Sequence, residues 1–352
     1  MESDEILFGR RGAAGLVEFN RPKALNALTL GMIRALTAKL DEWRNDASVT
    51  RVVVTAAGDR AFCAGGDLRE VTEQGRNGRY DEALAFWREE YQLNAKIKRY
   101  PKPYVALIDG IVMGGGVGVS INGSHRVAGD KFLFAMPEVG IGFFPDVGGT
   151  FILPRMPGEV GVYCALTGER LKAADGVGAG LAGWRVPSQR WPGLIEALCE
   201  PGPVDGVLNR MSEPAGEGPV MARRSAIDRL FAGDRVEDIL SRLDAEAAGA
   251  GTDAEFARAA AAAIRTKSPT SLRIALAQMR RGKALSFEEC MRIEFRIVSR
   301  VIRGRDFYEG VRAVIVDKDN KPVWRPASLA EVTDEDVERH FAPLGEGELE
   351  LP

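Results

Sequence analysis

The chain has 352 residues, only 2 histidines and 4 cysteines, and a formal net charge of −3 at pH 7. Two histidines cannot build a multi-histidine metal site, and we expect no bound metal. The small negative charge gives no general attraction to nucleic acid or to an anionic membrane, so neither is expected as a partner. Glycine accounts for 40 residues, a share above the average of about 7%.

The N-terminal sequence MESDEILFGRRG has no apolar segment like that of a signal peptide. No apolar run in the chain approaches the roughly 18 residues needed for a membrane span. The four cysteines are widely spaced, which argues against a zinc ribbon or a redox motif and fits a reducing compartment. We therefore expect a cytoplasmic protein.

The first 150 residues alternate between strand and helix patterns. Strands are predicted at residues 15–19, 51–55 and 103–108, and helices at 29–45 (with Thr29 as N-cap) and 81–99. A glycine-rich helix is expected over residues 113–121, followed by a strand pair, 126–128 and 132–134, around Gly129-Asp130. This alternation predicts a layered α/β core.

The second half is predicted to be almost entirely helical from about residue 207. The clearest helices are expected at 269–281 and 286–303. The alanine-rich segment 245–264 forms either one weakly anchored helix or a hinge around Gly249-Ala250-Gly251. The tail from about residue 343 is expected to be frayed.

Two glycine-rich segments have the pattern of a strand, a glycine turn and a helix start. They are AFCAGGDL at 61–68 and GIVMGGGV at 110–117, and neither forms a P-loop or a complete G-x-G-x-x-G motif. Free backbone N–H groups at a helix start favour negative charge, and two that converge on one carbonyl oxygen would form an oxyanion hole. The alternative is that these glycines only permit tight turns and close helix packing.

Glu138 and Asp146 are the only carboxylates in the apolar segment FAMPEVGIGFFPDVGG at 134–149. A carboxylate isolated among apolar side chains should have a raised pKa, which suits general acid or base catalysis. Structural alternatives exist for both. Glu138 could simply be a first-turn helix residue after Pro137, and Asp146 could be an N-cap before Val147.

The chain resembles the crotonase superfamily, also called the enoyl-CoA hydratase/isomerase group. The matching motifs are NRPKALNAL at 20–28, AFCAGGDL, the GGG helix start and PEVGIGFFPDVGG. Within the superfamily it is most similar to the 3-hydroxyisobutyryl-CoA hydrolase branch, through REEYQLN at 88–94, KSPTSLRIAL and RGRDFYEGVRAVIVDKDNKPVWRP. The resemblance implies an α/β fold, a crotonase-like spiral of ββα units with an all-helical C-terminal region. Residues 1–205 would form the acyl-CoA-binding catalytic core and 206–352 a helical region for capping or oligomerisation.

The resemblance also implies site residues. The backbone N–H groups of Gly66 and Gly115 would form the oxyanion hole, Glu138 would be the catalytic glutamate, and Asp146 the second carboxylate typical of the hydrolases. Glu90 would contact substrate, or alternatively be a solvated charge on a helix face. The coenzyme A portion is expected along Lys23, Ala24, Ala64, Gly65, Asp67 and Leu68.

The implied activity is hydrolysis of the thioester of 3-hydroxyisobutyryl-CoA to coenzyme A and the hydroxy acid, in valine catabolism. A second candidate substrate is 3-hydroxypropionyl-CoA. No cofactor is expected, since coenzyme A is part of the substrate. Gly118 stands where hydratases of the superfamily carry a glutamate, which puts hydration in doubt. An enoyl-CoA isomerase or hydratase and a non-catalytic acyl-CoA-binding protein stay open as alternatives, and so does a homotrimer or hexamer.

Overall fold

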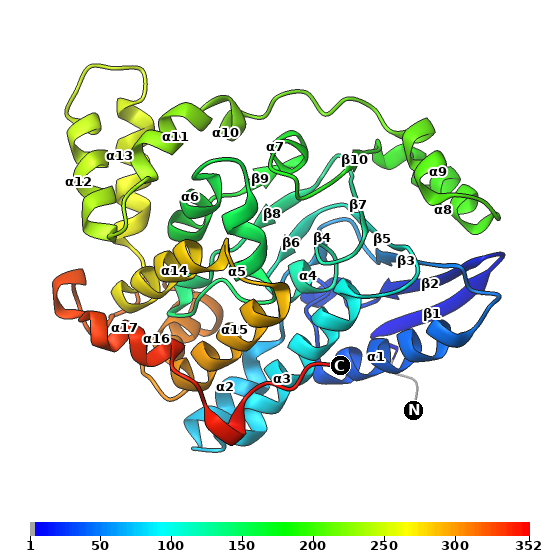
Figure 1. The fold of residues 1–352 in the computed structure, drawn as a ribbon, viewed down its shortest axis with the longest axis horizontal. Coiled ribbons are helices and arrows are strands. Elements are labelled where there is room, and N and C mark those ends of the chain that lie inside the picture. Colours follow the sequence, from blue (N-terminus) through cyan, green and yellow to red (C-terminus); the bar gives the residue numbers. More distant parts are fainter. Residues whose placement is uncertain (1–3) are drawn as a thin grey trace.

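The computed structural model describes residues 4–352, which form two sheets and a large set of helices (Figure 1). In spatial order the six-stranded sheet contains β1 (Ile6–Arg11), β2 (Ala14–Phe19), β3 (Arg51–Ala56), β5 (Tyr104–Ile108), β7 (His125–Ala128) and β10 (Trp184–Arg185). The four-stranded sheet contains β4 (Ala61–Cys63), β6 (Ile111–Met113), β8 (Leu133–Ala135) and β9 (Leu171–Lys172). The predicted α/β class is confirmed.

From β3 to β8, consecutive strands alternate between the two sheets. In the pairs β3/β4, β5/β6 and β7/β8, the first strand joins the larger sheet and the second joins the smaller one. This alternation produces a repeating unit of two strands and a helix, in agreement with the expected spiral. The prediction that 126–128 and 132–134 pair with each other is wrong, because β7 bonds to β5 and β10, and β8 bonds to β6 and β9.

Two helices of the first half, at residues 30–45 and 80–98, match those predicted from local sequence signals. The helices of this half are α1 (Leu30–Asn45), α2 (Leu68–Arg76), α3 (Tyr80–Lys98), α4 (Gly115–Gly118), α5 (Gly149–Ile152), α6 (Val160–Thr167) and α7 (Ala173–Gly178), with a short 3₁₀ turn at Pro22–Ala24 (η1) and another at Glu138–Ile141 (η2). Thr29 caps α1 as predicted, because its hydroxyl accepts the N–H of Met32 at 3.2 Å. The glycine helix expected over 113–121 contains only the single turn α4.

Every regular element after β10 is helical. These helices are α8 (Trp191–Cys199), α9 (Val204–Met211), α10 (Pro219–Ala222), α11 (Arg224–Phe231), α12 (Val236–Ala247), α13 (Ala254–Arg265), α14 (Pro269–Gly282), α15 (Phe287–Val301), α16 (Asp306–Val311) and α17 (Asp334–Phe341), with a π-helical turn at Arg312–Val316 and short 3₁₀ turns. The alanine-rich segment is divided between α12 and α13, so the single-helix alternative is wrong, and the break includes Gly249-Ala250-Gly251.

The inner strands of the six-stranded sheet are buried on both faces. Val53, Val105 and Leu107 pack on one side against Leu194 and Leu208, which belong to α8 and α9. The opposite side faces the main core, which runs from β1 to the C-terminal tail. Burial on both faces explains why the inner strands have nearly continuous apolar sequences.

The two halves of the chain share this main core. In Figure 1 the segment after α9 crosses the molecule to α10–α13, and α14 and α15 then return over the first half. α15 packs against α3 and α5, and α14 packs against α6. The predicted division at residue 205 falls inside α9, and a division into two domains stays a prediction.

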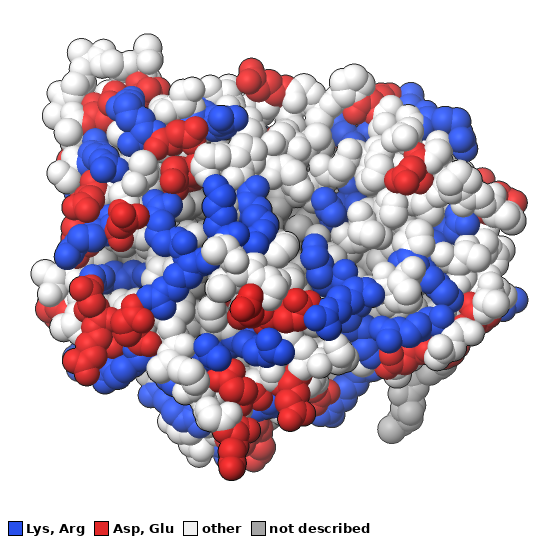
Figure 2. Space-filling view, in the orientation of Figure 1, with Lys and Arg blue, Asp and Glu red and all other residues white. Residues whose placement is uncertain are grey.

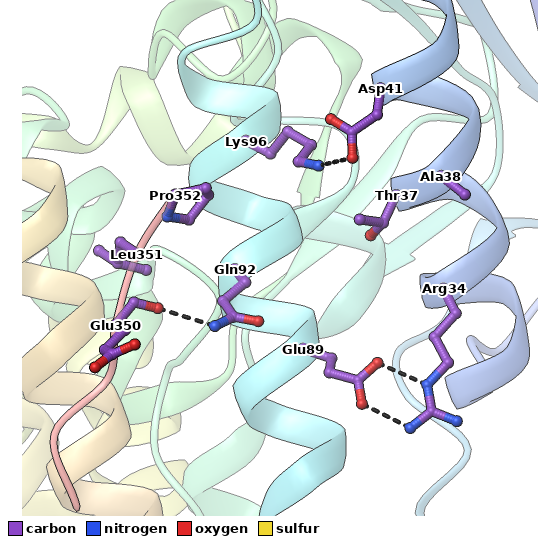
Figure 3. A pocket seen from close by; sticks show the side chains of 10 residues that line it. All are labelled: Arg34, Thr37, Ala38, Asp41, Glu89, Gln92, Lys96, Glu350, Leu351 and Pro352. Atoms are coloured by element: carbon purple, nitrogen blue, oxygen red, sulfur yellow. Dashed lines mark hydrogen bonds and ion pairs between the residues drawn. The ribbon is translucent and has the colours of Figure 1, made fainter.

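The C-terminal tail is packed on the outer side of α3, so the expected fraying is wrong. Leu349 is only 1% exposed. The Gln92 side chain donates to the Glu350 carbonyl at 3.0 Å, and Arg99 donates to the Pro352 carbonyl at 3.0 Å. The tail, α1 and α3 line a groove of about 510 Å³ (Figure 3). Its charged walls are joined by the ion pairs Arg34–Glu89 and Lys96–Asp41.

Charged side chains of both signs cover the face that carries the tail. A band of lysine and arginine crosses the middle of this face, and acidic side chains gather at its lower edge (Figure 2). Ion pairs such as Arg99–Glu288 and Arg296–Glu348 tie α3, α15 and the tail together. Within residues 4–352 no helix combines the length and apolar character needed to cross a membrane.

Candidate active site

The two glycine junctions lie side by side because β4 and β6 are parallel neighbours. The N–H of Leu28 donates to the Gly65 carbonyl at 2.9 Å, and the N–H of Asp67 donates to the Leu28 carbonyl at 2.8 Å. Neither hydrogen bond uses the N–H of Gly66, which points away from Leu28. Gly115 is the first residue of α4, so its N–H has no acceptor within that helix. Two available N–H groups therefore lie at one edge of the smaller sheet.

Close packing also requires glycine at the second junction. A Cβ atom on Gly115 would lie 2.5 Å from Oε1 of Glu90, and Gly114 has a φ of 46°. The packing interpretation of the glycines therefore applies at this junction, whereas the oxyanion hole stays a prediction.

Beside these junctions is a cavity of about 410 Å³. It brings together eight of the predicted site residues: Ala64, Gly65, Gly66, Leu68, Glu90, Gly115, Glu138 and Asp146. The carboxyl ends of β4, β6 and β8 supply the junctions and Glu138, and α3 supplies Glu90. Ligand sites in α/β folds commonly lie at this end of parallel strands.

Three predicted residues do not line the cavity. Lys23 and Ala24 are exposed on η1, which adjoins the cavity wall through a hydrogen bond from the Ala64 N–H to the Leu25 carbonyl at 3.0 Å. Asp67 pairs with Arg21 at 3.0 Å, outside the cavity. Contact of these residues with coenzyme A stays a prediction.

Glu90 and Glu138 are buried carboxyl groups with free oxygens. Glu90 is 2% exposed and Glu138 7%, so Glu90 is not a solvated surface charge. Among the described residues, Oε1 of Glu90 and Oε2 of Glu138 have no hydrogen-bond partner. Burial, and then the charge of Asp146, raises the pKa of both groups well above the ordinary range. Glu138 does start η2 after Pro137, as its structural alternative proposed, yet it also lines the cavity.

Asp146 accepts a hydrogen bond from the hydroxyl of Tyr91 at 2.8 Å. Burial raises the pKa of Asp146 to about 7, against the opposing effect of that hydrogen bond. The N-cap of the following helix, α5, is Gly148, so the alternative role of Asp146 as an N-cap is wrong. Burial therefore moves the pKa of one carboxyl group of the cavity towards neutrality.

Several lining residues were missed by the sequence analysis. The rings of Trp87 and Phe143 stack with centroids 5.7 Å apart. Trp87 precedes Glu90 by three residues on α3, so helical spacing from Glu90 could have found it. Lys267, Val314, Ile315 and Asn320 come from the C-terminal half. They lie in two segments that carry the family resemblance, KSPTSLRIAL and RGRDFYEGVRAVIVDKDNKPVWRP, but nothing in those segments predicted that they line the cavity. Lys267 is the one basic residue among those lining the described cavity, and no described side chain pairs with it.

The space beside Gly118 is occupied by Asn94. A Cβ atom on Gly118 would lie 2.6 Å from Nδ2 of Asn94, so no longer side chain fits there without rearrangement. Within residues 4–352 no cluster of His, Cys, Asp or Glu is arranged to hold a metal ion. Neither histidine lines the cavity.

Comparison with known proteins decides the family. Residues 14–341 match the model of the enoyl-CoA hydratase/isomerase family. The chain belongs to the enoyl-CoA hydratase/isomerase family. Among curated members it is 43% identical to the mitochondrial 3-hydroxyisobutyryl-CoA hydrolase of Danio rerio, over 99% of this chain and 92% of that protein.

Two solved structures of family members have the same fold, although these proteins are named for other activities. A protein from Mycobacterium thermoresistibile described as a carnitinyl-CoA dehydratase is 44% identical, with a TM-score of 0.93 and 99% of each chain covered. One from Rhodobacter sphaeroides described as an enoyl-CoA hydratase is 40% identical, with a TM-score of 0.91 over 99% of this chain and 100% of that chain. The C-terminal helical region is thus shared by these family members.

The raised pKa of Asp146 predicts how stability depends on pH. An aspartate in an unfolded chain has a pKa of about 3.9, whereas burial raises that of Asp146 to about 7. Between these two pKa values the folded protein keeps this proton while the unfolded chain loses it. The contribution of Asp146 to the free energy of unfolding is therefore lost as pH rises from about 4 to 7. Asp146→Asn cannot ionise and should lose less free energy of unfolding between pH 5 and pH 8 than the wild type. Urea unfolding at both pH values measures this, and equal losses would contradict it.

Proposed function

We propose that this family member hydrolyses the thioester of 3-hydroxyisobutyryl-CoA, giving coenzyme A and 3-hydroxyisobutyrate in valine catabolism. The observation that carries the proposal is the pairing of two buried carboxyl groups, Glu138 and Asp146, with the N–H groups of Gly66 and Gly115 around one cavity. The name of the Danio rerio relative, which matches nearly end to end, supports this substrate. No cofactor is required, because coenzyme A arrives as part of the substrate.

In this mechanism the acyl carbonyl oxygen accepts hydrogen bonds from the N–H groups of Gly66 and Gly115. They stabilise the negative charge of the tetrahedral intermediate, and loss of one such donor typically costs about 10²–10³ in rate. A backbone donor is fixed in place before the reaction, so no reorganisation is needed as charge develops.

Glu138 has two routes to the products. As a general base, it takes a proton from water while the water oxygen attacks the carbonyl carbon. As a nucleophile, it attacks the carbon itself, coenzyme A leaves, and water then hydrolyses the mixed anhydride. In both routes the departing thiolate needs a proton. Asp146, with a pKa raised to about 7 by burial, is present in the protonated form near neutral pH and can supply it.

The rival activities leave more of the site unexplained. An enoyl-CoA isomerase needs a single base at Glu138 and gives Asp146 and Glu90 no role. The names of the two similar solved structures suggest hydration or its reverse. Hydration is disfavoured because Gly118 stands where hydratases carry a glutamate, and Asn94 fills the space beside it. A non-catalytic acyl-CoA-binding protein would not need buried carboxyl groups, which are costly to keep.

Location and assembly stay predictions. The cytoplasmic location is a prediction, and the similar hydrolase of Danio rerio is named mitochondrial. A homotrimer or hexamer is proposed from the resemblance to the superfamily.

A thiol-release assay tests the proposed function. Purified protein is mixed with 3-hydroxyisobutyryl-CoA, 3-hydroxypropionyl-CoA or an enoyl-CoA, and free thiol and double-bond absorbance are followed together. Thiol release from the hydroxyacyl-CoA substrates supports the hydrolase. Double-bond migration without thiol marks an isomerase, loss of the double bond marks a hydratase, and binding without turnover marks a binding protein.

Glu138→Gln should stop coenzyme A release while leaving substrate binding intact. The amide can neither take a proton from water nor attack the carbonyl, so we expect kcat to fall by about 10²–10⁴. Calorimetry should give an acyl-CoA dissociation constant within about threefold of the wild type. Glu89→Gln is the control, since Glu89 lies on the outer side of α3 in an ion pair with Arg34. Turnover close to wild type in Glu138→Gln would rule out the assignment.

Lys267→Met should weaken binding of the negatively charged acyl-CoA. Lys267 is half-buried, and burial lowers its pKa, so an anionic group is the natural partner for its ammonium. A hydrogen bond to a charged group contributes about 1.5–3 kcal/mol, so we expect KM to rise about tenfold or more with little change in kcat. Lys283→Met, an exposed lysine following α14, is the control. An unchanged KM at low ionic strength would exclude this contact.

A further inference from the structure

The turn that carries Asp146 has an unfavourable backbone conformation. Val147 has a φ of 51° and Gly148 a φ of 96°. A positive φ is rare for a β-branched residue such as valine, so the surrounding structure must hold the turn in place. The orientation of the Asp146 carboxyl group depends directly on this turn.

Two residues of the C-terminal half form hydrogen bonds with the turn. Glu294 on α15 is fully buried, and its two carboxyl oxygens accept the N–H groups of Gly148 at 2.9 Å and Thr150 at 2.8 Å. Gln278 on α14 is also fully buried, and its Nε2 donates to the carbonyl of Pro145 at 2.9 Å and to Oγ1 of Thr150 at 2.7 Å.

Glu294 and Gln278 do not line the cavity and therefore cannot touch substrate there. We propose that both are positioning residues, which hold the turn at residues 145–150 so that Asp146 stays in its reactive orientation. The inference rests on the proposed function, in which Asp146 takes part in thioester hydrolysis. In this proposal α14 and α15 position a reacting carboxyl group, besides covering the core.

The opposite side of Asp146 is fixed as well. Tyr91 on α3 donates to its carboxyl group, and α15 packs against both α3 and α5. Asp146 thus lies between the hydroxyl group of Tyr91 and the turn that Glu294 and Gln278 hold. The hydrogen bonds from Glu294 and Gln278 to this turn are called the clamp below. Without Glu294, two N–H groups would be buried without an acceptor, and the turn would relax to satisfy them.

Glu294→Gln tests the clamp with almost no change in volume. The new amide places a donor against one of the two backbone donors, so the turn should loosen. We expect kcat for thioester hydrolysis to fall about 10- to 100-fold, as is common when a reacting group is displaced by about 1 Å. KM should change less than about threefold. Hydrogen exchange in the peptide covering residues 145–152 should become faster.

A double-mutant cycle with Asp146→Asn separates positioning from general damage. If Glu294 acts through Asp146, Glu294→Gln should change kcat less than about twofold in the Asp146→Asn background. A merely structural role would lower kcat by the same factor in both backgrounds and would overturn the proposal. Unchanged hydrogen exchange at 145–152 would overturn it too.

Two further variants keep the test decisive. Ile297→Val removes one buried methyl group from the same helix and offers no hydrogen bond to the turn, so its kcat should match the wild type. Gln278→Met replaces Glu294→Gln if the latter fails to fold, with the same expected results. A wild-type protein that releases no thiol would refute the proposed function, whereas the exchange measurement would still decide whether the clamp exists.

Discussion

The parallel pairing of β4, β6 and β8 is the constraint on which the site depends. Each strand is short, and each is followed within three residues by part of the cavity: the Gly65-Gly66 junction after β4, Gly115 after β6 and Glu138 after β8. Because neighbouring parallel strands end at the same edge, residues more than 70 positions apart in the chain meet there. The glycines allow the junctions to approach closely enough to present two backbone N–H groups together.

This arrangement carries an electrostatic cost. Glu90, Glu138, Asp146 and Glu294 are all buried, and burial raises the pKa of each, that of Glu294 to about 8. Ionising one of them disfavours ionisation of the others, so the group holds protons at a pH where exposed carboxylates would have lost them. The same burial that reduces stability at higher pH provides carboxyl groups suited to proton transfer near neutrality.

The C-terminal half completes the site in two ways. It supplies part of the cavity wall through Lys267, Ile315 and Asn320, and it contacts the backbone of the turn that carries Asp146. The tail extends this support to the outer side of α3, whose inner side carries Glu90 and Tyr91. A strained turn and a cluster of buried carboxyl groups are local costs, and the large shared core of both halves is what offsets them.

The sequence by itself determined the local features of the protein. Thr29 as a helix cap, the inner strands, the two glycine junctions and the paired Glu138 and Asp146 all follow from signals within a few residues. Only the tertiary structure decided that β7 and β8 join different sheets, that the tail packs on α3, and that Lys267, Gln278 and Glu294 reach the site. The physical reason is that these features depend on which distant elements pack together, and side-chain burial and hydrogen bonding between them leave no periodic trace in either segment alone.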